Sequence, residues 1–185
     1  MIPEFKEILN KKFRDIPDFP KSGILFKDIT PVLFDPYICD AIIEDIYWTY
    51  HFGGITVNAI AALESRGFFF GFALAQRFKV PFIPLRKPGK LPGNVISMEY
   101  AKEYGTDKIE MSADTTLGEF YNVLIHDDLL ATGGTAEAAG KLIQSTGANV
   151  AGFSFISSIK SLKGKEKLQP LLTAEKAKIY TILEF

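Results

Sequence analysis

Short apolar runs alternate along the chain with longer segments in which apolar residues recur at helical spacing. The runs predict buried strands at 57–63, 80–84, 123–125, 150–156 and 178–185. The periodic segments predict helices at 3–14, 36–50, 68–78 and 136–146. Such alternation is typical of an α/β fold, so we expect a central, mostly parallel sheet flanked by helices.

Two other segments do not fit this alternation. Residues 16–33 are rich in Pro and Gly and predict a shaped loop. Residues 94–101 and 106–111 read as two strands of a β-hairpin that follows a basic loop at 86–93. A length of 185 residues suits one domain with a substantial core. We therefore expect a single domain, 1–185, with a flexible hairpin lid arm at 86–112.

Composition narrows the class of protein. A net charge of −1 gives no electrostatic reason to expect nucleic acid or an acidic membrane as a partner. Cys39 is the only cysteine, which excludes an intrachain disulfide and fits a reducing compartment. The N-terminus lacks the apolar stretch of a signal peptide, and the longest apolar run, 68–75, is too short to span a bilayer. We expect a soluble cytoplasmic protein.

Candidate chemistry is concentrated at 121–135, where an apolar strand is closed by Asp127 and Asp128 and followed by the turn Ala-Thr-Gly-Gly-Thr. The first N–H groups of the next helix have no intrahelical partner and suit a phosphate. Glycines let the backbone approach that phosphate closely. The acidic pair suits sugar hydroxyls, and strand alternation indicates that its two members have different roles. We interpret this segment as a phosphate and sugar site.

A second strand repeats this logic at Glu64-Ser65-Arg66-Gly67. Ser65 and Arg66 stand where a backbone amide and a guanidinium could bind another anion, because the arginine fork bonds phosphate oxygens in pairs. A surface ion pair is the simpler reading of Arg66. Two such turns at one edge of a parallel sheet lie where open α/β sheets bind their ligands.

The motif DDLLATGGT after an apolar strand resembles the phosphoribosyl-pyrophosphate (PRPP) motif of the type I phosphoribosyltransferases. Ala131, in place of a second acid, is similar to the adenine-specific branch of that family. Further segments resemble the same branch, and they are FPKSGILFKDITPVL, ESRG, RKPGKLPG, EYGTDKIE and SLKGKEKL. The resemblance covers nearly the whole chain. It implies the type I fold, with residues 1–35 as a hood that recognises the base.

The resemblance also implies an activity, which is the transfer of phosphoribose from PRPP to N9 of adenine, giving AMP and pyrophosphate in purine salvage. It implies these site residues: for catalysis, Glu103, Arg66, Asp127 and Asp128; for the 5′-phosphate, Ala131, Thr132, Gly133, Gly134 and Thr135; for ribose, Asp127 and Asp128; for pyrophosphate, Ser65, Arg66, Arg86, Lys87 and Lys90; for adenine, Leu25, Phe26, Lys27 and Ile159; and for the lid, Glu103 and Tyr104. Glu103 would carry the proton at adenine.

The substrate itself indicates Mg²⁺, because pyrophosphate oxygens, ribose hydroxyls and waters can complete its shell with few protein ligands. Asp127 or Asp128 could take part through water. The family suggests a homodimer. His126 is expected to be a packed strand residue, and Ser158 stands where the resembled enzymes more often carry an acid. Two alternatives stay open: a phosphoribosyltransferase for another nucleobase, and a regulator that binds PRPP without catalysis.

Overall fold

The computed structural model describes residues 3–101 and 105–185, so the predicted lid residues Glu103 and Tyr104 lie outside the described part of the chain. The chain forms two compact units, residues 1–45 and 46–185. Helix α3 (Pro36–Phe52) continues from the first unit into the second. In the described residues no helix combines the length and the apolar character needed to cross a membrane.

The first unit contains helix α1 (Pro3–Lys12), a two-stranded ribbon and the short helix α2 (Thr30–Leu33). The ribbon pairs β1 (Arg14–Ile16) with β2 (Phe26–Asp28) in antiparallel register. An ion pair between Arg14 and Asp28, at 2.6 Å, joins its two strands. The sequence predicted only a loop here, because strands of three residues are too short to show a period.

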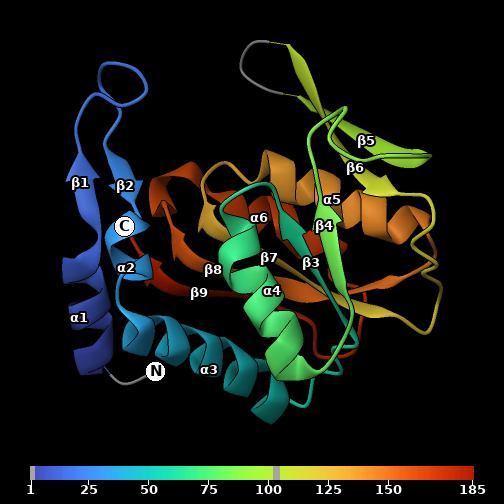
Figure 1. Cartoon of the computed structure of the whole chain (residues 1–185), viewed down its shortest axis with the longest axis horizontal. Helices are drawn as coiled ribbons and strands as arrows, with labels where there is room; N and C mark the ends of the chain where they lie inside the picture. The colour runs from blue at the N-terminus through green and yellow to red at the C-terminus, as the bar shows by residue number, and fades with distance from the viewer. Residues whose placement is uncertain (1–2, 102–104) are drawn as a thin grey trace. The chain divides into compact units, whose positions relative to one another are not determined.

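The second unit is built on a five-stranded sheet in the order β4-β3-β7-β8-β9 (Figure 1). Every neighbouring pair in this sheet is parallel, which confirms the predicted central sheet. The strands are β3 (Ala59–Leu63), β4 (Phe82–Leu85), β7 (Asn122–Leu130), β8 (Asn149–Ser158) and β9 (Lys178–Glu184). The predicted apolar runs therefore all became strands.

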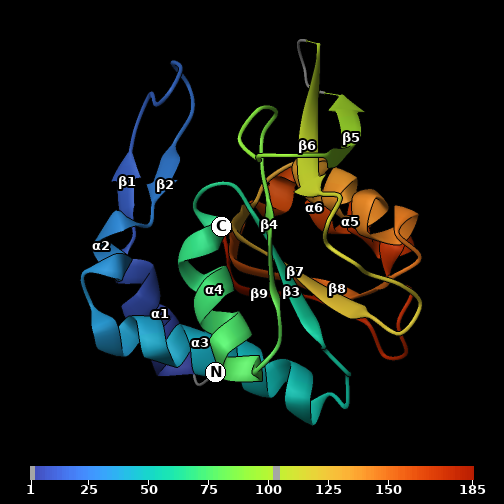
Figure 2. The same ribbon diagram turned by 45° about the vertical axis from the view of Figure 1, so that its right-hand side comes forward.

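Helices α4 (Gly67–Phe78) and α5 (Gly134–Ser145) cover opposite faces of this sheet (Figures 1 and 2). On one face, Ile125 and its alternate neighbours pack with Leu142 and Ile143 of α5 in the main core cluster. On the other face α4 lies so close to β3 that a Cβ atom on Gly71 would be 2.4 Å from the Cβ of Ala62. Alternate apolar residues of each strand thus serve two helical layers.

Strands β5 (Val95–Ala101) and β6 (Thr106–Ser112) form an antiparallel hairpin, as predicted. Its apolar residues Ile96, Met98 and Tyr100 pack against the main core. Its role as a lid remains a prediction. After β8 the chain forms a short 3₁₀ turn η1 (Lys160–Leu162), helix α6 (Gly164–Leu168) and a second 3₁₀ turn η2 (Gln169–Leu171).

Candidate active site

The carboxyl ends of β3, β4 and β7 meet at one edge of the sheet around a cavity of about 230 Å³. Four of the predicted site residues line this cavity together, namely Arg86, Lys87, Asp127 and Thr135. The remaining lining residues are Glu64, Leu85, Tyr100, Lys108 and Ile109. Carboxyl ends of parallel strands are where open α/β sheets bind ligands, so this cavity is the candidate site.

The sequence predicted that Asp127 and Asp128 close strand β7. The prediction is wrong, because both residues lie within the strand. The strand continues to Leu130 because its pairing with β8 extends through Leu129 and Leu130 to Ser157 and Ser158. The two side chains differ in surroundings, as strand alternation requires. Asp127 lines the cavity, whereas Asp128 pairs with Arg66, its Oδ2 lying 3.1 Å from the guanidinium Nε.

The electrostatics of this acidic pair are dominated by burial. Burial, followed by the neighbouring charge of Asp128, raises the pKa of Asp127 well above its ordinary value. Burial also raises the pKa of Asp128, although the Arg66 guanidinium acts in the opposite direction. The Asp128 amide donates a hydrogen bond of 2.9 Å to Oδ1 of Asp127. The protonation of Asp127 therefore depends on that of Asp128, and the two carboxyl groups titrate as a pair.

The turn at 131–135 leads into α5, which begins at Gly134 and not at the predicted 136. Gly133 adopts a left-handed conformation at φ 79° as the N-cap, a geometry that glycine favours. The Glu137 amide donates to the Gly133 carbonyl at 2.8 Å and forms the first helical hydrogen bond. The amides of residues 134–136 precede that bond, so they can donate to an anion.

The turn at 64–67 comes within close reach of β7. Ser65 and Arg66 stand directly before α4, which begins at Gly67, and the peptide bond between Glu64 and Ser65 is cis. A Cβ atom on Gly67 would lie 2.9 Å from the His126 carbonyl oxygen, so glycine permits this approach. The approach brings Arg66 of this turn to Asp128 of β7.

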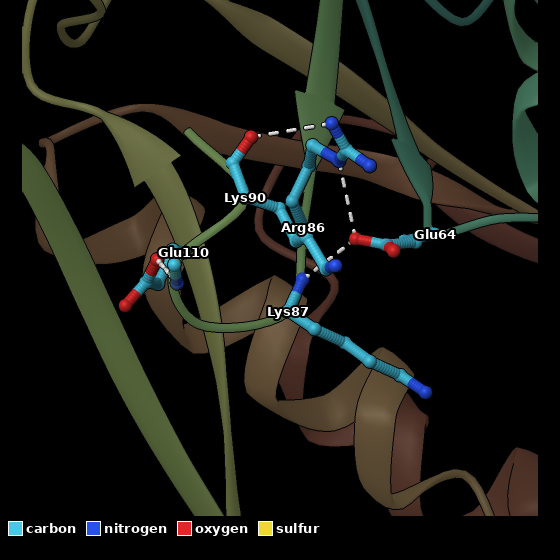
Figure 3. A network of polar contacts seen from close by, with 6 residues as sticks. Glu64, Arg86, Lys87, Lys90 and Glu110 are labelled. Carbon is cyan, nitrogen blue, oxygen red and sulfur yellow. Dashed lines mark hydrogen bonds and ion pairs between the residues drawn. The ribbon is translucent and has the colours of Figure 1, made fainter. Parts of the chain in front are cut away.

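The basic loop that follows β4 is held by carboxylates (Figure 3). Oε2 of Glu64 accepts hydrogen bonds from the Arg86 Nε at 3.1 Å and from the Lys87 amide at 2.9 Å. The Arg86 guanidinium also donates to the Lys90 carbonyl at 3.2 Å. On the other side, Oε2 of Glu110 accepts from the Gly89 amide at 3.1 Å. Neither glutamate was singled out from the sequence, although Glu64 directly follows a buried strand, as ligand-site residues of parallel sheets do.

A second cavity, of about 160 Å³, lies at the carboxyl ends of β7, β8 and β9. It contains the predicted adenine contact Ile159 together with Leu130 and Glu184, and its remaining lining residues are Ser158, Lys160, Lys163, Gly164, Lys165 and Glu166. Leu25, Phe26 and Lys27 belong to the other unit, where Phe26 contacts the ring of Phe19 with centroids 5.0 Å apart. The predicted pairing of Phe26 with Ile159 stays a prediction.

His126 is fully buried on β7, as predicted for a packed strand residue. Its Nδ1 lies 2.9 Å from the Ser154 hydroxyl on the neighbouring strand. Burial lowers the pKa of His126 to about 3, so the imidazole is neutral at physiological pH. A buried neutral histidine on this face fits packing and not proton transfer in the cavity.

Comparison with known proteins gives consistent matches over most of the chain. A family model for the phosphoribosyl transferase domain matches residues 34–168. The adenine phosphoribosyltransferase of Cytophaga hutchinsonii is 47% identical over 168 residues, covering 91% of each chain. That of Methylococcus capsulatus is 49% identical over 160 residues, covering 86% of this chain and 92% of the relative.

Solved structures show the same likeness in three dimensions. The crystal structure of adenine phosphoribosyltransferase from Thermoanaerobacter pseudethanolicus has a TM-score of 0.89 at 44% identity and covers 97% of this chain and 99% of its own. The Saccharomyces cerevisiae enzyme, complexed with D-2,5-dideoxy-2,5-imino-altritol 1,6-bisphosphate and adenine, has a TM-score of 0.86 at 36% identity. It covers 98% of this chain and 100% of its own.

Proposed function

The chain belongs to the phosphoribosyltransferase family, among the adenine phosphoribosyltransferases, and from this premise we propose how its site works. The enzyme transfers the 5-phosphoribosyl group of PRPP to N9 of adenine, giving AMP and pyrophosphate. One observation carries the assignment of the site. A single cavity gathers a carboxylate, the turn before α5 and the basic loop, through Asp127, Thr135, Arg86 and Lys87.

The charges of the reaction fit this arrangement. Breaking the bond between C1′ and pyrophosphate develops positive charge on the ribose and negative charge on the leaving group. Asp127 faces the cavity and accepts hydrogen bonds from ribose hydroxyls. Asp128 holds Arg66, whose guanidinium, with Lys87 and Lys90, stabilises the charge of the departing pyrophosphate. The amides at 134–136 and the hydroxyls of Thr132 and Thr135 hold the 5′-phosphate.

The donor set at the cavity fits Mg²⁺, which prefers carboxylate, hydroxyl and phosphate oxygens. Asp127 and Thr135 offer such oxygens, and Asp127 or Asp128 would hold the ion through water. When bound, the ion neutralises pyrophosphate charge. Adenine occupies the apolar cavity around Ile159, and Glu103 carries the proton. We further propose a cytoplasmic homodimer that acts in purine salvage.

The test is pyrophosphate release from PRPP with adenine, hypoxanthine, guanine, xanthine or uracil as the acceptor. We expect release with adenine and at least about 100-fold less with the other bases. Preference for another base would identify the alternative transferase, and no release with any base would identify a PRPP-binding regulator. Either result would overturn the proposal.

Substitution of the acidic pair tests the mechanism. Asp128→Ala removes the partner of Arg66, so we expect turnover to fall by about 100-fold or more while circular dichroism stays unchanged. Asp114→Ala removes an exposed carboxylate that does not line the cavity and serves as the control, with unchanged turnover. Equal turnover in Asp128→Ala and the wild type would exclude the role given to this pair.

A further inference from the structure

The basic loop at 86–90 presents an electrostatic problem. Two of its cations, Arg86 and Lys87, line the cavity to which we assign pyrophosphate, yet Glu64 lines the same cavity. An ionised carboxylate beside a bound polyanion costs free energy, because like charges repel. A residue with only that effect would weaken binding of the leaving group. The position of Glu64 therefore requires a reason other than contact with substrate.

The hydrogen bonds of Glu64 supply that reason. Its Oε2 accepts from the side chain of Arg86 and from the backbone of Lys87, two consecutive residues at the start of the loop. The glutamate side chain is only 15% exposed, so little water competes for these bonds. Burial acts to raise the pKa of Glu64, but the bonds from Lys87 and Arg86 outweigh it and hold the pKa below its ordinary value. The Glu64 carboxylate, which clamps the start of the loop through Arg86 and Lys87, is therefore charged at physiological pH.

The clamp fixes the direction of Lys87. Figure 3 shows the Lys87 amide turned toward Glu64 and its side chain extending away from that carboxylate. The far end of the loop is held independently by Glu110, which is 9% exposed and accepts from the Gly89 amide. Backbone hydrogen bonds of 2.9 and 2.7 Å between Arg86 and Glu110 attach the loop to β6. The loop is thus held from two sides.

We propose that Glu64 is a positioning residue for the leaving-group site, acting through Arg86 and Lys87 on the pyrophosphate of PRPP. It aligns the basic loop with the turn at 64–67 and directs the Lys87 ammonium into the cavity. This inference rests on the proposed function, because it assigns the anion that the loop receives. Glu110 supports the same loop from its far end.

If Glu64 acts only through its charge, its removal changes the affinity for pyrophosphate in one direction. If Glu64 positions the loop, its removal changes that affinity in the opposite direction, which makes the proposal testable. If Glu64 acted only through its charge, its removal would leave the cavity more positive and pyrophosphate would bind more tightly. If Glu64 positions the loop, Glu64→Ala weakens binding of magnesium pyrophosphate by about 10- to 100-fold, since misplaced groups lose binding steeply. Glu64→Gln keeps an acceptor oxygen and is expected to lose less, roughly 3- to 10-fold.

The experiment is calorimetric titration of each variant with magnesium pyrophosphate and, separately, with ribose 5-phosphate. Ribose 5-phosphate reports on the turn before α5, so its affinity should stay within about twofold of wild type in both Glu64 variants. Glu119→Gln is the control for loss of a charge. It removes an exposed carboxylate that lines neither this cavity nor the one around Ile159, and it should leave pyrophosphate binding unchanged.

The outcomes separate the two proposals. Weaker pyrophosphate binding with unchanged ribose 5-phosphate binding supports the positioning role, and equal or tighter pyrophosphate binding in either Glu64 variant overturns it. Parallel loss of both ligands would also overturn it, because a structural defect moves both. Thermal unfolding decides whether Glu64→Ala is folded, and Glu64→Gln carries the test if it is not. A wild type that binds no pyrophosphate and forms no AMP would instead refute the proposed function.

Discussion

At the scale of single residues, strand β7 separates three titratable side chains by alternation. His126 and Asp128 point to the face that carries α4 and Arg66, whereas Asp127 points into the cavity. His126 is fully buried and Asp128 is 3% exposed, while Asp127 is partly exposed. The three consecutive residues 126–128 therefore contribute both to the core and to the site.

The depressed pKa of His126 predicts acid sensitivity. The folded state binds this proton only near pH 3, whereas the unfolded chain binds it near pH 6.5. His126 therefore does not lower the free energy of unfolding above about pH 6.5, and it lowers that free energy progressively as the pH falls toward 3. For His126→Leu we expect this loss to disappear, a difference of about 2 kcal/mol between pH 6 and pH 4. Urea unfolding across that range measures it. The exposed His51, changed to Gln, should leave the pH dependence intact.

The raised pKa of Asp127 predicts a pH dependence of stability of the opposite sign. Its raised pKa means that the folded state keeps a proton that the unfolded chain releases near pH 4, so the cost of ionisation grows as the pH rises. Asp127→Asn removes that cost and should raise the unfolding temperature at pH 8 by about 3 °C, with the gain vanishing near pH 4. Asp114→Asn provides an exposed control. A gain that is the same at both pH values would contradict this account.

The predictable part of the site was residue type and spacing. Acids after an apolar run and glycines before a helix could be recognised, because each has a chemical reason that holds within a few residues. Glu64 could not be assigned, since its partners Arg86 and Lys87 lie more than twenty residues away. Only the pairing of β3 with β4 brings them together.

At the scale of elements, the turn before α5 packs directly against the start of α6. A Cβ atom on Gly164 would lie 2.4 Å from the Ala131 carbonyl oxygen, and one on Gly133 would lie 3.0 Å from the Gly164 carbonyl oxygen. The turn and α6 are thus in backbone contact, which only glycine allows. The contact of α6 with the turn could not be predicted from the sequence, because packing between elements leaves no local pattern.

This contact predicts an unusual result for a helical glycine. Gly-to-Ala changes in helices normally stabilise, but Gly164→Ala should destabilise by about 1–3 kcal/mol because the added methyl meets backbone. It should also weaken AMP binding, since the turn that holds the phosphate must shift. Gly118→Ala, which meets nothing within 4 Å, is the control for both measurements. Chemical denaturation measures the free energy of unfolding, and titration measures the affinity for AMP. If both are unchanged in Gly164→Ala, the contact does not constrain the turn.

Element boundaries were harder to predict than element types. Strand β7 runs beyond its acids, and α5 starts two residues before the predicted position. Strand β7 is longer than predicted because its pairing with β8 continues past the acids. Helix α5 starts earlier because Gly133 supplies its N-cap. Hydrophobic periodicity carries neither of these interactions.

At the scale of the molecule, the predicted class was correct because each apolar run became a strand of one parallel sheet. The sheet places its candidate site at the carboxyl ends of β3, β4 and β7. What sequence could not predict is the division into units at Asp45 and Ile46, which falls inside the continuous helix α3. A helical pattern continues across such a boundary without a change.

Ligand binding should stabilise the molecule by mass action. At 100 times its dissociation constant, AMP should add about 2.7 kcal/mol to the free energy of unfolding, a rise in unfolding temperature of about 8 °C. Adenosine, which lacks the phosphate, should produce a much smaller shift at the same concentration. Chelation with EDTA should leave the AMP shift intact and reduce the shift given by pyrophosphate. Equal shifts for AMP and adenosine would contradict the assigned phosphate cradle.

Strand β7 contributes to both cavities, because Asp127 lines one and Leu130, three residues further along the strand, lines the other. Two fragments with modest affinity, one apolar and one anionic, could therefore be joined by a tether along this strand. A short tether turns the second contact into an intramolecular event at millimolar effective concentration. Inhibitor discovery on this scaffold would then depend more on linker geometry than on the strength of either fragment.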